Sequence, residues 1–202
     1  RPQKGPRIER LPDEHNPWGV PVLDVRPVPL PQDAPRDPGE AVGGDVLDVV
    51  LDQGPDQRGV EVEGGERPAP LAAETAPFPG MLELAGELEE RGIPWGIVTN
   101  KPAWLTDPLV EAMALHERAG CVVSGDTCPE RKPHPQPILH ACSLIGRLPG
   151  DTWYIGDAGR DMQAGRAAGC TTVAALYGYL HPDDPPEHWE SDLTIDDPEQ
   201  LL

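Results

Sequence analysis

Short apolar runs that alternate with amphipathic segments constrain the fold of this chain more than any other feature. From residue 77 onward, segments of helical period end at glycine and lead into short runs rich in Val, Ile and Ala. Such alternation indicates right-handed strand–helix–strand units around a parallel sheet. We therefore predict a doubly wound, Rossmann-like α/β core over residues 77–202. The expected strands are 95–98, 121–123, 153–155, 171–175 and 193–195, and the expected helices are 82–88, 102–117, 137–145 and 160–168.

Residues 1–76 differ sharply in composition and predict no fold of their own. Pro and Gly make up 25 of the first 80 residues, a proportion typical of low-complexity or disordered sequence. Two apolar runs, 20–25 and 46–51, could form short strands, but Pro21 interrupts the first and Asp48 the second. We expect this segment to be irregular or disordered, with a domain boundary near residue 77.

The composition excludes several classes of protein and favours a cytoplasmic one. A net charge of −19 argues against binding to the phosphate backbone of nucleic acids. No apolar stretch approaches the roughly 18 residues of a membrane span, and the first residues do not resemble a secretory signal. The four cysteines form no Cys-x-x-Cys pair, so we expect reduced thiols rather than disulfides or a zinc site.

The chemistry of the chain concentrates in residues 153–161, where an apolar run ends in Gly156-Asp157 and Asp161 follows four residues later. A carboxylate at the end of a buried parallel strand lies in the crevice where open α/β sheets bind ligands. Two carboxylates beside glycines suit a hard cation such as Mg²⁺. We predict that Asp157 and Asp161 are metal ligands, although Asp161 could also be a first-turn helix acid.

Two polar residues precede this motif in the sequence. Thr99 ends the apolar run 96–98, and Lys132 lies in the turn Lys132-Pro133-His134-Pro135 before an expected helix. Taken singly, Thr99 could cap the following helix, and Lys132 could be a solvated turn lysine. Neither residue indicates a function alone; only their order, together with the downstream Asp157, is specific.

Strand-end Thr, turn Lys and strand-end Gly-Asp-x-x-x-Asp resemble motifs II, III and IV of the haloacid dehalogenase superfamily. The resemblance covers residues 78–202. Within the superfamily, Val-Thr-Asn-Lys-Pro at 98–102 and Tyr-Gly-Tyr-Leu-His-Pro at 177–182 look like the phosphoglycolate phosphatase branch. The tail with Trp189 and Ser191-Asp192 is similar to N-acetylmuramic acid 6-phosphate phosphatases.

The resemblance implies Mg²⁺-dependent hydrolysis of a small phosphomonoester through an aspartyl-phosphate. It implies that Thr99 and Lys132 are catalytic, and that Thr99, Lys132 and the backbone beside Asn100 bind the substrate phosphate. Asp157, assisted by Asp161, would hold the Mg²⁺. The expected partner is a small phosphorylated metabolite, either phosphoglycolate or N-acetylmuramic acid 6-phosphate.

The nucleophile motif of this family, an apolar strand followed by Asp-x-Asp-Gly-Thr, is absent from the printed sequence. No Asp-x-Asp occurs before Phe78; Asp24 and Asp52 each follow a short apolar run but have no carboxylate two residues later. In this fold the nucleophile strand is central, so we expect an opening in the middle of the sheet. We also expect phosphatase activity at background.

We hypothesise that residues 1–70 come from a shifted reading frame or a spliced foreign segment. The abrupt change in composition, the lack of an initiating Met and the return of family-like sequence at residue 71 motivate this hypothesis. One of the other two frames of the underlying DNA should then encode an apolar strand with Asp-x-Asp-Gly-Thr. If neither frame does so, the hypothesis is wrong.

Two other functions stay open at this point. The chain could be a non-catalytic binding or regulatory protein in which the same residues keep a weak anion and metal site. A phosphoacceptor receiver domain also carries Asp, Thr and Lys at strand ends, but the Lys-Pro-x-Pro turn and the Gly-Asp-x-x-x-Asp motif do not fit it. Downstream, His181, Asp183 and Asp184 form a polar cluster, either in a surface loop or at a contact with substrate or another subunit.

Overall fold

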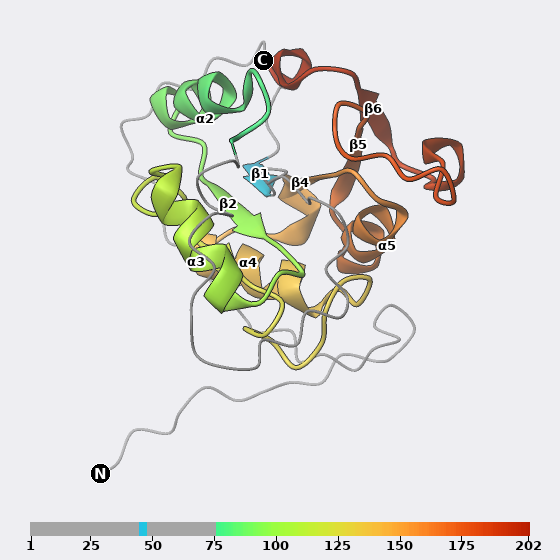
Figure 1. Cartoon of the computed structure of the whole chain (residues 1–202), viewed down its shortest axis with the longest axis horizontal. Coiled ribbons are helices and arrows are strands. Elements are labelled where there is room, and N and C mark those ends of the chain that lie inside the picture. Colours follow the sequence, from blue (N-terminus) through green and yellow to red (C-terminus); the bar gives the residue numbers. More distant parts are fainter. Residues whose placement is uncertain (1–44, 48–75) are drawn as a thin grey trace. The chain divides into compact units, whose positions relative to one another are not determined.

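The computed structural model describes residues 45–47 and 76–202, all within one compact unit, Glu40–Leu202 (Figure 1). The strands are β1 (Asp45–Leu47), β2 (Trp95–Val98), β3 (Val122–Val123), β4 (Thr152–Gly156), β5 (Thr171–Ala175) and β6 (Leu193–Ile195). The helices are α2 (Met81–Glu90), α3 (Ala103–Ala112), α4 (Gln136–Ile145) and α5 (Gly159–Ala168), with short 3-10 helices at Pro149–Asp151, Pro186–His188 and Pro198–Leu201. No helix in the described ranges is long and apolar enough to cross a membrane.

The described strands form one parallel sheet in the order β3-β2-β1-β4-β5-β6. Each strand expected from the sequence is present, and its ends differ from the expected ones by at most one residue. Because helices connect the parallel strands and pack on both faces, the predicted doubly wound α/β fold is confirmed.

Strand β1 corrects one expectation from the sequence. Val46 lies opposite Trp95 of β2 on one side and Trp153 of β4 on the other, so the centre of the sheet is filled and the expected opening is wrong. The two flanking strands would otherwise carry unpaired N–H and C=O groups, which any short extended segment can satisfy without an alternating side-chain pattern. The domain boundary near residue 77 stays a prediction, and run 20–25 lies outside the described residues.

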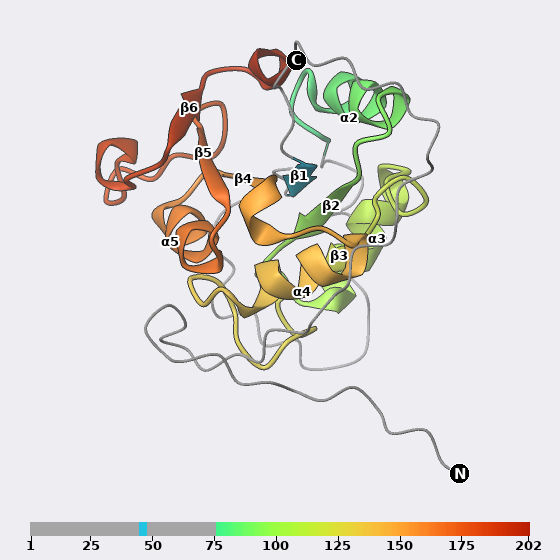
Figure 2. The ribbon, with the colours of Figure 1, turned by 180° about the vertical axis from the view of Figure 1, so that it is seen from behind.

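Successive residues of the strands fill two apolar cores on opposite faces of the sheet. One core joins α2 and α3 to Trp95 and Ile97, and the other joins α4 and α5 to Val98 and Tyr154. Neighbouring residues in a strand point to opposite faces, so β2 contributes to both cores. Figure 2, the view from behind, brings α4 forward. The helical layers thus cover the faces and leave the carboxyl edge of the strands for ligands.

Helix α3 ends earlier than the helical period predicts. Ala114 adopts a left-handed conformation with φ of 54°, its N–H donates to the carbonyl of Glu111, and the N–H of Leu115 donates to the carbonyl of Val110. These two bonds form a Schellman closure, which normally brings an apolar residue back onto the helix. Leu115 is buried for this reason, although it lies beyond the helix.

Candidate phosphate and metal site

Thr99 and Asp157 lie at the same level of the carboxyl edge of the sheet. Leu47 of β1 is opposite Gly96 of β2 and Tyr154 of β4. Thr99 follows Gly96 by three residues, and Asp157 follows Tyr154 by three residues. Because the strands are parallel, both residues leave the sheet at the same edge, one on each side of β1.

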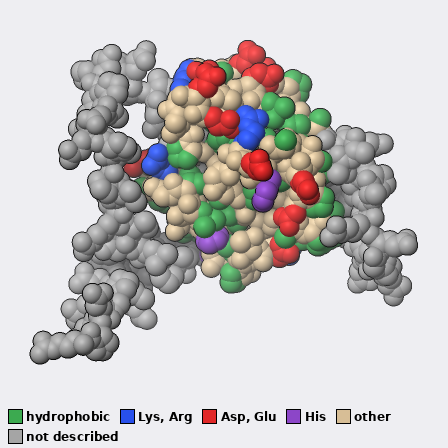
Figure 3. Space-filling model, turned by 90° about the vertical axis from the view of Figure 1, so that its left-hand side faces the viewer, with side chains coloured by type: hydrophobic (Ala, Val, Ile, Leu, Met, Phe, Trp, Pro, Cys, Tyr) green, Lys and Arg blue, Asp and Glu red, His purple; other side chains and the backbone are tan. Residues whose placement is uncertain are grey.

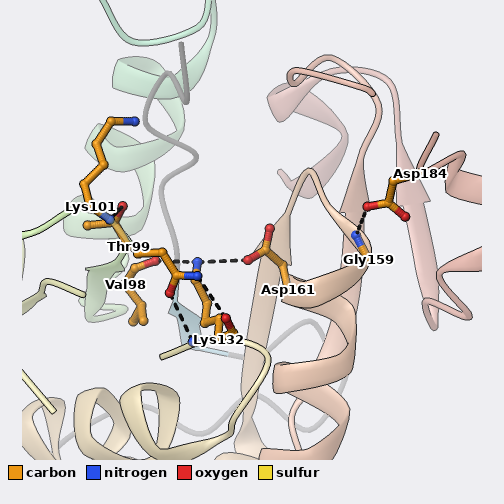
Figure 4. A network of polar contacts seen from close by, with 8 residues as sticks. Val98, Thr99, Lys101, Lys132, Gly159, Asp161 and Asp184 are labelled. Atoms are coloured by element: carbon orange, nitrogen blue, oxygen red, sulfur yellow. Dashed lines mark hydrogen bonds and ion pairs between the residues drawn. The ribbon is translucent and has the colours of Figure 1, made fainter. Parts of the chain in front are cut away.

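The Lys132 ammonium group is buried between these two strand ends (Figure 4). Its Nζ donates to the carbonyl oxygen of Val98 at 2.8 Å and lies 2.9 Å from Oδ1 of Asp161. It also lies 5.5 Å from the centroid of the Tyr154 ring. The side chains of Lys132 and Asp161 are each only 1% exposed, so the alternative of a solvated turn lysine is wrong.

The Asn100 side chain fixes the backbone of Lys132. Its Nδ2 donates to the Lys132 carbonyl at 2.9 Å, and its Oδ1 accepts from the Lys132 N–H at 3.0 Å. This pair of bonds joins the loop after β2 to the turn before α4, which are 32 residues apart in sequence. The side chain of Asn100 is therefore occupied, and the backbone beside it is the part that can face a ligand.

The Thr99 hydroxyl organises the loop after β2. Its Oγ1 accepts a hydrogen bond from the Lys101 N–H at 3.1 Å. A hydroxyl that accepts one bond keeps its proton for a second partner, such as an anion. Thr99 does not cap α3, because the N-cap residue is Pro102 and the Ala103 N–H donates to Asp126.

Asp157 is buried beneath the loop that follows β5. Its Oδ2 accepts a hydrogen bond from the Tyr179 N–H at 3.0 Å. Burial raises the pKa of the Asp157 carboxyl, and the charge of Asp161 raises it further. The Tyr179 bond and the positive charges of Lys132 and Arg160 lower the pKa but do not cancel the effect of burial. The pocket therefore disfavours a carboxylate that lacks a bound cation.

Asp161 lies in the first turn of α5 and points toward Lys132 (Figure 4). Its Oδ2 is buried and has no hydrogen-bond partner within the described part of the chain. The side chain packs directly on Gly156, where an added Cβ would lie 2.4 Å from the Asp161 Cβ. A first-turn acid that only balanced the helix dipole would not need this burial or this ion pair.

The carboxylates of Asp157 and Asp161 fit a hard cation that takes its other ligands from water and substrate. Mg²⁺ is commonly bound by one or two carboxylates together with water and substrate phosphate. The unpartnered Asp161 Oδ2 and the desolvated Asp157 carboxylate are oxygen donors of this kind. In residues 45–47 and 76–202, no group of three or more His, Cys, Asp and Glu side chains could hold a metal. Asp24 and Asp52 lie outside these ranges.

The structure adds two positions for which the sequence analysis assigned no role. Tyr179 donates its N–H to Asp157, and Gly178 lies so close that an added Cβ would be 2.3 Å from the Asp157 Cβ. The only signal in the sequence was the Tyr-Gly-Tyr turn itself. Its contact with Asp157 depends on β5 lying next to β4, which no local pattern specifies.

The fold and this edge together define a class of doubly wound α/β proteins with a lysine, a hydroxyl and a carboxylate pair at the strand ends. The chain belongs to the haloacid dehalogenase-like hydrolase family, whose model matches residues 68–175. The resemblance predicted from the three motifs is therefore confirmed.

The chain is similar to curated phosphatases and to a solved structure of this family. The chain is 41% identical over 126 residues to the N-acetylmuramic acid 6-phosphate phosphatase of Pseudomonas aeruginosa, an alignment that covers 62% of this chain and 56% of the relative. It is 41% identical over 131 residues to the phosphoglycolate phosphatase of Xanthomonas campestris pv. campestris, covering 65% and 59%. The crystal structure of a predicted phosphoglycolate phosphatase from Haemophilus somnus matches with a TM-score of 0.60 at 29% identity, covering 64% and 57%. The chain thus spans a little over half the length of these relatives.

Asp157→Asn is expected to raise the free energy of unfolding at pH 7 when Mg²⁺ is absent. Burial raises the pKa of this carboxyl in the folded state, so its stabilising contribution is complete below the unfolded pKa, about 3.9, and is lost as the pH rises through the folded pKa. The Asn side chain carries no charge at any of these pH values. Urea unfolding between pH 4 and pH 8 should therefore show a gain for the variant that grows with pH.

Asp107→Asn is the matched control, because Asp107 is exposed and its carboxylate stays in water. It should leave the free energy of unfolding nearly unchanged across the same range. A loss of stability in Asp157→Asn at pH 7 would contradict the inferred desolvation of Asp157.

Proposed function

We propose that the strand-end site binds Mg²⁺ and a small phosphomonoester, in the manner of a phosphoric monoester hydrolase. The observation that carries this proposal is the buried ion pair between Lys132 and Asp161, which lies between the Thr99 strand end and the Asp157 strand end. Burying the Lys132 ammonium beside the carboxylates of Asp157 and Asp161 costs free energy. A bound phosphate would pair with the ammonium, and a bound metal ion would pair with the carboxylates.

Each residue has a role that its contacts support. Thr99 would donate its hydroxyl proton to a phosphoryl oxygen, and the backbone beside Asn100 would donate to another. Lys132, whose backbone is held in place by the Asn100 side chain, would neutralise negative charge on the transferring phosphoryl group. Asp157 and Asp161 would hold Mg²⁺, which when bound supplies Lewis-acid stabilisation of charge on the phosphoryl group.

The names of the relatives support the class of substrate. One relative is an N-acetylmuramic acid 6-phosphate phosphatase and another a phosphoglycolate phosphatase, so we propose one of these small phosphorylated metabolites for this chain. Nucleic acid does not suit a net charge of −19. On the described part of the face in Figure 3, acidic side chains lie scattered among apolar ones without a continuous basic stripe. We also propose a cytoplasmic location, which four cysteines outside any disulfide support.

Hydrolysis by this chain as printed is expected at background. The family mechanism uses an aspartate nucleophile, and no Asp-x-Asp precedes Phe78 in the sequence. Asp24 and Asp52 are the candidates that could replace this nucleophile, and both lie outside the described residues. Binding without turnover is therefore the result we expect.

Calorimetry and a phosphatase assay test both parts of this proposal. The wild-type chain should bind Mg²⁺ and inorganic phosphate, Asp157→Asn should lose Mg²⁺ binding, and neither protein should hydrolyse p-nitrophenyl phosphate above background. Turnover that requires Mg²⁺ and disappears in Asp157→Asn would show that the nucleophile is present after all. Absence of binding for both ions would contradict the proposed site.

A second candidate function is a non-catalytic phosphate- and metal-binding or regulatory protein. The observation in its favour is that the binding side chains are assembled around Lys132 although the nucleophile motif is absent from the sequence. A regulatory protein should bind one phosphorylated metabolite much more tightly than inorganic phosphate, whereas an inactivated enzyme need not. Competition calorimetry with phosphoglycolate and inorganic phosphate separates the two.

A further inference from the structure

Helix α5, which carries Asp161, has no capping side chain of its own. Its N-cap residue is Ala158, and the first helical N–H groups need acceptors from outside the helix. Asp184, 25 residues downstream, supplies one, because its Oδ2 accepts the Gly159 N–H at 2.9 Å (Figure 4). The negative charge of Asp184 also suits the N-terminal end of the helix dipole.

The other oxygen of Asp184 is fixed by Trp189. The indole N–H of Trp189 donates to Oδ1 of Asp184 at 2.7 Å, and the indole is buried against Met162 and Ala174. The carboxylate lies so close to the start of α5 that a Cβ added to Gly159 would be 2.8 Å from Oδ1. Asp184 is therefore held in one orientation by a buried aromatic anchor.

The segment between β5 and β6 thus contacts the metal-site motif at two points. At one point the Tyr179 N–H donates to Asp157, and at the other Asp184 accepts from Gly159. The Asp161 carboxylate follows within the turn that Asp184 caps. The positions of both carboxylates consequently depend on this one segment.

We propose that Asp184 is a positioning residue, which holds the first turn of α5 so that Asp161 and Asp157 can bind a divalent cation together. This inference rests on the proposed function. Asp184 acts through the helix rather than as a ligand, because its two oxygens are directed to the Gly159 N–H and to the Trp189 indole N–H. The polar cluster predicted from the sequence is thereby divided: Asp184 supports the site, while the Asp183 side chain is 93% exposed.

Asp184→Asn in the full chain is the direct test. Gly159 and Trp189 donate to different oxygens of Asp184, so an Asn in the same orientation sets its NH₂ group against one of these two N–H donors. Loss of a group that orients metal ligands typically weakens metal binding by about 10–100-fold, and we expect this increase in the Mg²⁺ dissociation constant by calorimetry. The affinity for inorganic phosphate, measured without Mg²⁺, should change much less, because the Val98 carbonyl and the Asn100 side chain still hold Lys132 when Asp161 shifts.

Asp183→Asn is the matched control, since it removes the same charge from the neighbouring exposed residue and should leave Mg²⁺ binding unchanged. Trp189→Phe is the second variant; it removes the indole donor and should weaken Mg²⁺ binding in the same direction. Equal Mg²⁺ affinities for Asp184→Asn and Asp183→Asn would overturn the proposal. So would a parallel loss of Mg²⁺ and phosphate affinity, which indicates general unfolding.

Absence of Mg²⁺ binding in the wild-type chain would contradict the proposed function but would still leave the positioning role testable. The carboxyl ¹³C signals of Asp157 and Asp161 report their surroundings without any metal. Asp184→Asn should shift the Asp161 signal, and Asp183→Asn should not. If neither variant shifts it, the inference is wrong.

Discussion

Lys132→Met is expected to lower the free energy of unfolding by about 3–5 kcal/mol, the usual cost of removing one partner of a buried ion pair. The variant leaves the Asp161 carboxylate, 1% exposed, without its cation, and leaves the Val98 carbonyl without its donor. Inorganic phosphate binding should disappear at the same time. Urea unfolding at pH 7 and calorimetry measure the two effects.

Two further variants test the reason for this loss. Adding Asp161→Asn to Lys132→Met should recover part of the stability, because the uncompensated charge is then absent. Arg91→Met is the control: Arg91 pairs with Glu87 at 2.8 Å, but both side chains are substantially exposed, so the change should cost less than about 1 kcal/mol. If Lys132→Met costs no more than Arg91→Met, the ammonium is not buried in solution.

Gly156→Ala is expected to lower the free energy of unfolding by about 1–3 kcal/mol, which is typical of overpacking a buried site. An added Cβ would lie 2.4 Å from the Asp161 Cβ and 2.9 Å from its Cγ, so the first turn of α5 must move away from β4. Moving Asp161 separates it from both Lys132 and Asp157. We therefore also expect Mg²⁺ affinity to fall by at least about tenfold, as when the support of a metal ligand is lost.

Gly150→Ala is the matched control, because nothing lies within 4 Å of a Cβ added at Gly150. Its stability should be unchanged or should rise by up to about 1 kcal/mol through a less flexible unfolded chain. Urea unfolding and Mg²⁺ calorimetry compare the two variants. Normal Mg²⁺ binding by Gly156→Ala would contradict the inferred contact between the glycine and Asp161.

The helices and strands of residues 77–202 could be predicted because their signals are local. Gly146 and Gly169 each follow a helix and adopt a positive φ. Because glycine favours this conformation, a glycine after a helical period predicts the end of the helix. The apolar run before Asp157 is likewise visible without any partner strand. The end of α3 could not be predicted from the apolar period, because Leu115 continues that period after the helix has ended.

The four proposed site residues could be named from the sequence because their order at strand ends and turns resembles the motifs of a known family, and such positions need no tertiary information; they are Thr99, Lys132, Asp157 and Asp161. Their supporting contacts could not be named. The Asn100 bonds to Lys132 and the Asp184 cap on Gly159 join residues 32 and 25 positions apart. Nothing in the spacing of such residues distinguishes them from the polar residues of a solvated loop.

The sequence by itself determined the order of helices and strands and the chemical types of residue at the carboxyl edge, because apolar period and turn propensity act over a few residues. Only the tertiary structure decided that Asp45–Leu47 fills the centre of the sheet, and that Lys132 is buried against Asp161. These outcomes depend on which distant segments satisfy exposed backbone groups and buried charges, and that requirement appears only when the strands lie side by side.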